Sequence, residues 1–121
     1  MCGFVGFSDN RAPEEKKAIL QRMMDRIVHR APDMGDNWAD RQVGLGFRRL
    51  SIIDLSECGA QPMFNEDGTV AVVFNGEIYN FMELRQDLEA KGHLFASNAD
   101  TEVLVHGWEE YGEALVPKLR G

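Results

Sequence analysis

The sequence predicts an α+β fold, because helical and extended hydrophobic patterns both occur along its 121 residues. Between residues 19 and 27, apolar side chains recur at three- and four-residue spacing, which predicts a helix over residues 13–29. Over residues 43–52, apolar side chains alternate with glycine, arginine or serine, which predicts a strand. The run VAVVF at residues 70–74 is apolar on both faces and predicts a second, central strand.

The first part of the chain adds a short strand and fixes where the helix stops. Residues 3–8 are apolar and interrupted by glycine, and they predict a buried strand with Cys2 at its mouth. Pro32 ends the helix, because the residue before a proline avoids the α region. Gly44 and Gly46 remove side chains from one face of the next strand, so another backbone or a ligand can come close there.

The second part of the chain alternates turn signals with short periodic segments. Residues 54–63 have no clear period and predict a loop, and residues 65–68 predict a turn. Asn75-Gly76 alone would signal a hairpin. The sequence that follows predicts instead a helix over residues 81–91, with Asn80 and Glu83 as a capping box. Asn75-Gly76 is therefore interpreted as a strand-end element.

The last segments are less regular. Residues 93–96 predict a short strand, and Asp100 suits the cap of a helix that Gly112 ends. A further apolar pattern starts near residue 115 and stops with the chain, so we expect these residues to be the first part of a larger domain.

Composition excludes several classes of function. Thirteen basic and 20 acidic residues give a net charge of −7, which argues against binding to nucleic acid or to an anionic membrane. No apolar run approaches the roughly 20 residues of a membrane span, and the N-terminus lacks the basic region of a signal peptide. Cys2 and Cys58 form no metal-binding spacing with the three histidines, so no metal is expected. A disulfide between Cys2 and Cys58 is an alternative, but a reduced cytoplasmic chain is favoured.

Cys2 is the first candidate for chemistry. Methionine is commonly removed before a small residue, and removal of Met1 would place a thiol and a free α-amine on one residue. That amine has an ordinary pKa of roughly 7.7–8.0 and can accept the thiol proton near neutral pH, which activates the nucleophile. A retained Met1 would turn the amine into an amide, which cannot act as a base.

Five further motifs occur with Met1-Cys2-Gly3 in a fixed order. They are His29-Arg30-Ala31-Pro32-Asp33, the run Leu45-Gly46-Phe47-Arg48-Arg49-Leu50-Ser51-Ile52-Ile53-Asp54, Gln61-Pro62, Phe74-Asn75-Gly76-Glu77-Ile78-Tyr79-Asn80 and Asp100-Thr101-Glu102. Together they cover the whole chain, which resembles the class II glutamine amidotransferase domain and, within that class, the glutamine-hydrolysing asparagine synthetases. Amidotransferases that pass ammonia to a sugar or peptide acceptor are the alternative.

The resemblance implies an N-terminal-nucleophile (Ntn) fold, an αββα sandwich of two antiparallel sheets. It implies L-glutamine as substrate and no cofactor in this domain, of which residues 1–121 would be the N-terminal part. It also implies a following synthetase domain that uses ATP and Mg²⁺, so that this chain alone could be inactive. Strands missing from the sheet would leave an edge that invites a homodimer.

The resemblance also assigns roles to individual residues. Cys2 would be the nucleophile, and the Asn75 side-chain amide with the Gly76 backbone N–H would form the oxyanion hole. The glutamine-binding residues would be Arg49 for the α-carboxylate, Glu77 and Asp100 for the α-ammonium, and the backbone around Leu50, Ile52 and Ile53 for the pocket wall. For Arg49 a solvent-facing strand position, and for Asp100 a plain helix cap, are the alternatives.

Two residues depart from the family pattern. Ala31 stands where glycine is usual, and a positive φ there would cost alanine about 1–2 kcal/mol. Phe47 stands where histidine is common, which removes any polar role at that position. His29, His93 and His106 are interpreted as surface or packing residues and Cys58 as an inert thiol. A non-catalytic module is the competing interpretation for a chain that retains Met1.

Overall fold

The computed structural model describes residues 2–50 and 59–121, so Met1, Ile52, Ile53 and Cys58 lie outside the described residues. The chain divides into two compact units, residues 1–62 and 63–121, and each is described by itself. Both units contain antiparallel strands, and helices occur in both, which confirms the α+β class. No helix among the described residues is long and apolar enough to cross a membrane.

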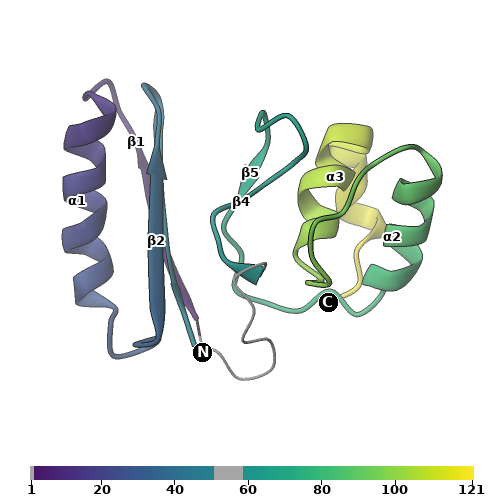
Figure 1. Cartoon of the computed structure of the whole chain (residues 1–121), viewed down its shortest axis with the longest axis horizontal. Helices are drawn as coiled ribbons and strands as arrows, with labels where there is room; N and C mark the ends of the chain where they lie inside the picture. Colours follow the sequence, from purple (N-terminus) through teal and green to yellow (C-terminus); the bar gives the residue numbers. More distant parts are fainter. Residues whose placement is uncertain (1, 51–58) are drawn as a thin grey trace. The chain divides into compact units, whose positions relative to one another are not determined.

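The first unit is a three-stranded antiparallel sheet with one helix on a face (Figure 1). Its strands are β1 (Gly3–Ser8), β2 (Met34–Ala39) and β3 (Val43–Arg49), in the order β1-β3-β2. Helix α1 (Pro13–Arg26) packs against all three. The long middle strand therefore carries the register of the whole sheet.

Glycines on β2 and β3 leave room for side chains of α1 to pack against the sheet. A Cβ at Gly44 would lie 3.0 Å from Leu20 Cδ1, and a Cβ at Gly46 would lie 2.7 Å from Met24 Sδ. Gly35 on β2 faces the same methionine, with a Cβ position 2.9 Å from Met24 Cε. Leu20 and Met24 are 0% and 1% exposed. The side-chain-free face predicted from the sequence is thus filled by a helix, which buries its apolar stripe there.

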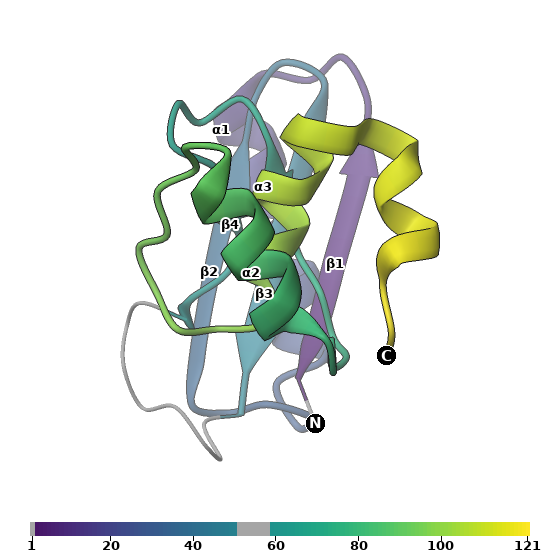
Figure 2. The ribbon, with the colours of Figure 1, turned by 90° about the vertical axis from the view of Figure 1, so that its right-hand side faces the viewer.

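The second unit is smaller in sheet and richer in helix. A short hairpin joins β4 (Met63–Phe64) to β5 (Ala71–Val72), and the helices are α2 (Phe81–Ala90), α3 (Glu102–Tyr111) and the 3₁₀ helix η2 (Gly112–Lys118). Helix α2 packs against α3 (Figure 2), which also contacts η2.

One apolar cluster holds this unit together. Its buried members are Ile78, Leu84, Leu88 and Val103, all at most 7% exposed. Two come from one face of α2 at four-residue spacing, as predicted for an amphipathic helix. Ile78 precedes α2 in a segment without regular structure, so this segment is anchored in the core at the residue that follows Asn75, Gly76 and Glu77.

Several predicted elements are confirmed, with shifted ends. The strand over residues 3–8 and the helix over residues 81–91 agree with β1 and α2 to within one residue. Gly112, which ends α3, has a φ of +56°. The predicted helix 13–29 instead stops at Arg26, because the following turn closes with three-residue hydrogen bonds such as Ile27 N–H to the Met24 carbonyl, 3.1 Å.

Other predictions were wrong. Strand β2 was not predicted, because its sequence MGDNWA has no alternation and contains residues that strands disfavour. The predicted strand 70–74 pairs over two residues only, and its residues are half-buried rather than central. Residues 93–96 form no strand, because carboxylates take their backbone donors: Leu94 N–H donates to Glu66 at 2.9 Å and Ala96 N–H to Glu102 at 2.6 Å.

The capping box at Asn80 was also wrong. Asn80 makes no side-chain bond to the first turn of α2. Its amide donates to the Lys118 carbonyl at 2.8 Å, and its Oδ1 accepts from the Arg120 N–H at 2.9 Å. Tyr79 N–H adds a bond of 2.7 Å to the Arg120 carbonyl. Asn80 therefore fastens the end of the chain to the start of α2 instead of capping the helix.

Candidate active site

The sheet register brings Cys2 and Arg49 together in the first unit. Gly3 pairs with Arg48 at the end of the β1–β3 ladder, and Cys2 and Arg49 are the next residues beyond this pair on the two sides. Gly3 faces α1, since a Cβ there would lie 3.1 Å from Ile27 Cδ1. Because side chains alternate along a strand, Cys2 and Arg49 belong to the opposite face. Cys2 is a half-buried free thiol.

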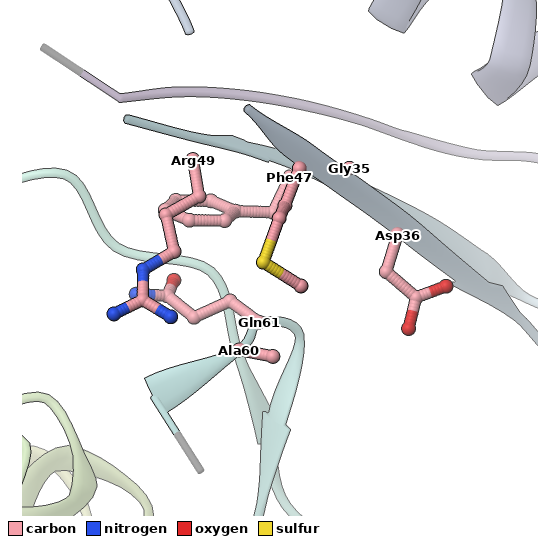
Figure 3. Close-up of a pocket in the computed structure, with 7 residues that line it drawn as sticks. Gly35, Asp36, Phe47, Arg49, Ala60 and Gln61 are labelled. Carbon is pink, nitrogen blue, oxygen red and sulfur yellow. The ribbon is translucent and has the colours of Figure 1, made fainter. Parts of the chain in front are cut away.

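A pocket of about 140 Å³ opens beside Arg49. It is lined by β2 and β3 residues Met34, Gly35, Asp36, Phe47 and Arg49 and by Ala60 and Gln61. Figure 3 shows the Arg49 guanidinium beside the Gln61 side chain, with the Asp36 carboxylate pointing away from both. The volume is below the roughly 300–1,000 Å³ of drug-sized sites, so this pocket suits only a small group.

The neighbouring arginine has a different task. Arg48 lies on the α1 side of the strand, where its Nε donates to the Ala31 carbonyl at 2.9 Å and its guanidinium to the Pro32 carbonyl at 3.2 Å. These bonds hold the loop after α1 against the sheet. Arg48 is therefore structural, whereas Arg49 faces the pocket.

The two departures from the family pattern cause no strain. No non-glycine residue among the described positions has a positive φ, so Ala31 does not carry the expected penalty, and it is fully buried. Phe47 is 4% exposed and lies opposite Phe4 in the β1–β3 register. Its ring is a wall of the pocket, which is a packing role rather than a polar one.

The second unit holds the other predicted residues. Asn75, Gly76 and Glu77 are exposed on the segment between β5 and α2. A Cβ at Gly76 would lie 2.6 Å from the ring of Phe74, so any larger residue there would require that ring to move.

Asp100 is tied to this segment and is not a helix cap. Its Oδ2 accepts from the Ile78 N–H at 2.7 Å, and the N-cap position of α3 belongs to Thr101. The bond spans 22 residues and holds the strand-end segment against the start of α3. Glu77 and Asp100 are thus brought to the same part of the second unit.

Glu102 orders the backbone that leads to Asp100. Its carboxylate accepts from the Ala96 and Ser97 N–H groups at 2.6 and 2.8 Å and from the Ser97 hydroxyl at 2.5 Å. Burial opposes ionisation of Glu102, but these hydrogen bonds and that of His106 hold its pKa below the ordinary 4.5. Glu102 belongs to the motif Asp100-Thr101-Glu102, and its role here is to position the backbone.

The predicted residues therefore form two groups, one in each unit. Cys2 and Arg49, with the half-buried Leu50 next in the chain, belong to the first, and Asn75, Gly76, Glu77 and Asp100 to the second. Sequence reasoning missed the pocket walls Gly35, Asp36 and Ala60, for which no local pattern exists. It also missed a cluster of Glu66, His93, His106 and Glu109, for which the three-residue spacing of the last two on α3 was a signal.

Comparison with known proteins decides the family. The model of the glutamine amidotransferase domain matches residues 1–121, the whole chain. The chain belongs to this family.

The relatives of this chain include glutamine-hydrolysing asparagine synthetases. The chain is 49% identical over 125 residues to asparagine synthetase [glutamine-hydrolyzing] 1 of Bacillus subtilis and 44% identical over 124 residues to synthetase 2 of that organism. It is 40% identical over 124 residues to asparagine synthetase [glutamine-hydrolyzing] 1 of Arabidopsis thaliana. All of this chain is covered in each case, but only 20%, 16% and 20% of the relatives. The chain therefore spans about a fifth of the length of these relatives, or less.

Proposed function

We propose that this chain hydrolyses L-glutamine to glutamate and ammonia through a thioester on Cys2, once Met1 has been removed. The observation that carries the proposal is the match of the amidotransferase family over all 121 residues. The cross-strand position of Cys2 next to Arg49 supports it, because a nucleophile and a carboxylate-binding group then share one sheet end. The αββα sandwich of the Ntn fold is part of the same proposal.

The reaction needs each predicted residue in a stated role. The Cys2 α-amine takes the thiol proton, and the thiolate attacks the side-chain amide carbon of glutamine. The Asn75 amide and the Gly76 N–H stabilise the resulting oxyanion, a contribution of roughly 3–4 kcal/mol for each such donor. The carbon–nitrogen bond then breaks, ammonia leaves with the transferred proton, and water hydrolyses the thioester to glutamate.

Recognition of glutamine rests on the two charged groups of its amino-acid end. The planar guanidinium of Arg49 binds the α-carboxylate with two parallel donors. Glu77 and Asp100 receive the α-ammonium, and backbone groups of Leu50, Ile52 and Ile53 complete the wall. Asp100 keeps one oxygen on the Ile78 N–H, which fixes the direction of its carboxylate. Three charged side chains would select a free amino acid over a peptide-linked glutamine.

The ammonia would serve ATP-dependent synthesis of asparagine from aspartate. The relatives are named glutamine-hydrolysing asparagine synthetases and are about five times as long as the matched region. We infer a synthetase domain elsewhere in the protein, with ATP and Mg²⁺ bound there and none needed for the glutaminase step. These names favour aspartate, rather than a sugar or a peptide, as the acceptor of the ammonia.

Intact mass and glutamate release test the proposal together. We expect a protein lighter by one methionine, releasing glutamate and ammonia in equal amounts, and no release from Cys2→Ser. Cys58→Ser is the matched control, since it removes the other thiol and should keep full activity. A protein that retains Met1 and shows no thiol-dependent hydrolysis would establish the non-catalytic module instead.

A further inference from the structure

Four metal-ligating side chains meet in the second unit. Glu66 lies in the β4–β5 turn, His93 follows α2, and His106 and Glu109 are on α3. One ligand atom from each lies within 4.8 Å of all the others. The histidine side chains are 9% and 1% exposed, whereas the carboxylates reach the surface. None of these residues has a role in the glutamine hydrolysis proposed above.

The distances fit a shared cation. His93 Nδ1 and His106 Nδ1 each lie 3.1 Å from Glu66 Oε1, and His93 Nδ1 lies 3.7 Å from Glu109 Oε2. Ligand atoms of a tetrahedral site with bonds of about 2.0–2.1 Å are separated by about 3.3–3.4 Å. Small side-chain rotations would bring these atoms to that spacing.

The outer ring nitrogens are already oriented by carboxylates. His93 Nε2 lies 2.9 Å from Glu110 Oε2, and His106 Nε2 lies 3.1 Å from Glu102 Oε1. Metal-binding histidines almost always donate their second N–H to such a partner, which fixes the tautomer and turns the other nitrogen toward the ion. Both histidines of the cluster have this arrangement.

His106 Nδ1 supplies an independent observation. It is a fully buried nitrogen without a hydrogen bond, although Glu66 Oε1 is 3.1 Å away, because the direction to that oxygen does not suit an N–H donor. With Nε2 donating to Glu102, Nδ1 carries either a lone pair or an N–H that has no hydrogen-bond partner. A buried polar atom left in this state costs about 1–3 kcal/mol. A cation between the two atoms satisfies both.

Charge and the remaining contacts point the same way. Four carboxylates, those of Glu66, Glu102, Glu109 and Glu110, surround two imidazoles, so an excess of negative charge persists even with both rings protonated. The two ligating carboxylates are held in place by the Leu94 N–H at 2.9 Å and the Asn65 amide at 2.9 Å. The bonds end on Glu66 Oε1 and Glu109 Oε2, the oxygens that face the histidines, and a carboxylate oxygen has a second lone pair with which to bind an ion.

We propose that Glu66, His93, His106 and Glu109 bind one divalent transition-metal ion, with Zn²⁺ the best fit to two imidazoles and two carboxylates. Four protein ligands make a closed, structural site. The ion joins the β4–β5 turn, the segment after α2 and helix α3. It thereby braces the same helix whose first turn follows Asp100.

Titration of chelator-treated protein with Zn²⁺ alone tests the proposal by calorimetry. We expect one ion per chain and a rise in the unfolding temperature with Zn²⁺ concentration. His93→Gln and His106→Gln should abolish saturable binding at the concentrations that saturate the wild type. Glu110→Gln should weaken binding by about 10–100-fold, since it removes only an orienting partner. His29→Gln, the matched control outside the cluster, should bind like the wild type.

Co²⁺ spectra and an exposed-ligand variant distinguish binding at this cluster from binding by the thiols and from loss of folding. Co²⁺ should give visible bands of a tetrahedral nitrogen–oxygen site without a thiolate charge-transfer band, which separates this cluster from adventitious binding by Cys2 or Cys58. Glu109→Gln alters a side chain that is 37% exposed, so it should fold normally and still lose the Zn²⁺-dependent stabilisation. Absence of stoichiometric binding, a thiolate band, or equal binding by the histidine variants and His29→Gln would overturn the proposal.

Discussion

Two adjacent arginines on β3 offer a matched test of glutamine recognition. Arg49 lines the pocket, whereas Arg48 donates to the Ala31 and Pro32 carbonyls at 2.9 and 3.2 Å. Replacing each by lysine keeps the charge and removes the planar fork of donors. The two variants therefore separate binding of the substrate from support of the loop.

The expected magnitude follows from the bonds at stake. In Arg49→Lys, loss of one hydrogen bond to the substrate carboxylate costs about 1.5–3 kcal/mol. Since 1.4 kcal/mol corresponds to tenfold, KM for glutamine should rise about 10–150-fold. The carboxylate lies far from the reacting amide, so kcat should stay nearly constant. In Arg48→Lys we expect a loss of about 1–3 kcal/mol in the free energy of unfolding and little change in KM.

Steady-state glutaminase kinetics and urea unfolding of both variants provide the assay. An unchanged KM in Arg49→Lys would refute its assignment to the α-carboxylate. A rise in KM of equal size in Arg48→Lys, with unaltered unfolding, would show that the two side chains have been assigned to the wrong faces of the strand.

Three further predictions concern the framework. Ala31→Gly should lower the free energy of unfolding by about 0.4–1 kcal/mol, because no positive φ favours glycine there. A higher free energy of unfolding of the variant in urea titrations would contradict this. Asp100→Ala should lower the free energy of unfolding by about 1–3 kcal/mol and speed hydrogen exchange of the Ile78 amide, because this amide loses its acceptor. Exchange of the Ile78 amide as slow as in the wild type would exclude that bond. The Val43 and Gln42 N–H groups hold the pKa of Asp40 below its ordinary 3.8, so Asp40 stabilises above that pH and the contribution disappears as pH falls through the lowered pKa. The difference in unfolding free energy between wild type and Asp40→Asn should therefore shrink on acidification, and a difference independent of pH would refute it.

Local patterns predicted the elements that bury a single face. Helix α1 and strand β3 are both readable because apolar residues repeat at the period of each structure. The glycines of β3 predicted that another group packs closely against one face of the strand, and the structure shows that Leu20 and Met24 of α1 fill this space. Strand β2 was invisible because pairing with β3, rather than its own composition, makes it extended.

Local motifs failed where distant partners competed for the same side chain. Asn80 and Asp100 both sit at positions typical of helix caps, yet their partners are 38 and 22 residues away. Likewise, residues 93–96 have a strand-like composition, but carboxylates from Glu66 and Glu102 occupy their backbone donors. A capping propensity of about 1 kcal/mol is easily overridden by a tertiary hydrogen bond of similar strength.

The candidate site divides in the same way. Its residue types came from motifs in the sequence, whereas the placement of Cys2 and Arg49 at the same end of the β1–β3 ladder depends on strand register, which no motif encodes. The roles of Cys2, Asn75, Gly76, Glu77 and Asp100 stay predictions that the structure alone does not test. The histidine cluster was missed because only His106 and Glu109 share a helix, whereas Glu66 and His93 come from two other segments.

The most direct test of glutaminase chemistry is the mass of the protein quenched in acid during turnover of glutamine. We expect a γ-glutamyl adduct on a peptide that begins at Cys2, present in wild type and Cys58→Ser and absent in Cys2→Ser. An adduct on Cys58, or steady hydrolysis by Cys2→Ser without any adduct, would contradict a thioester on the N-terminal cysteine.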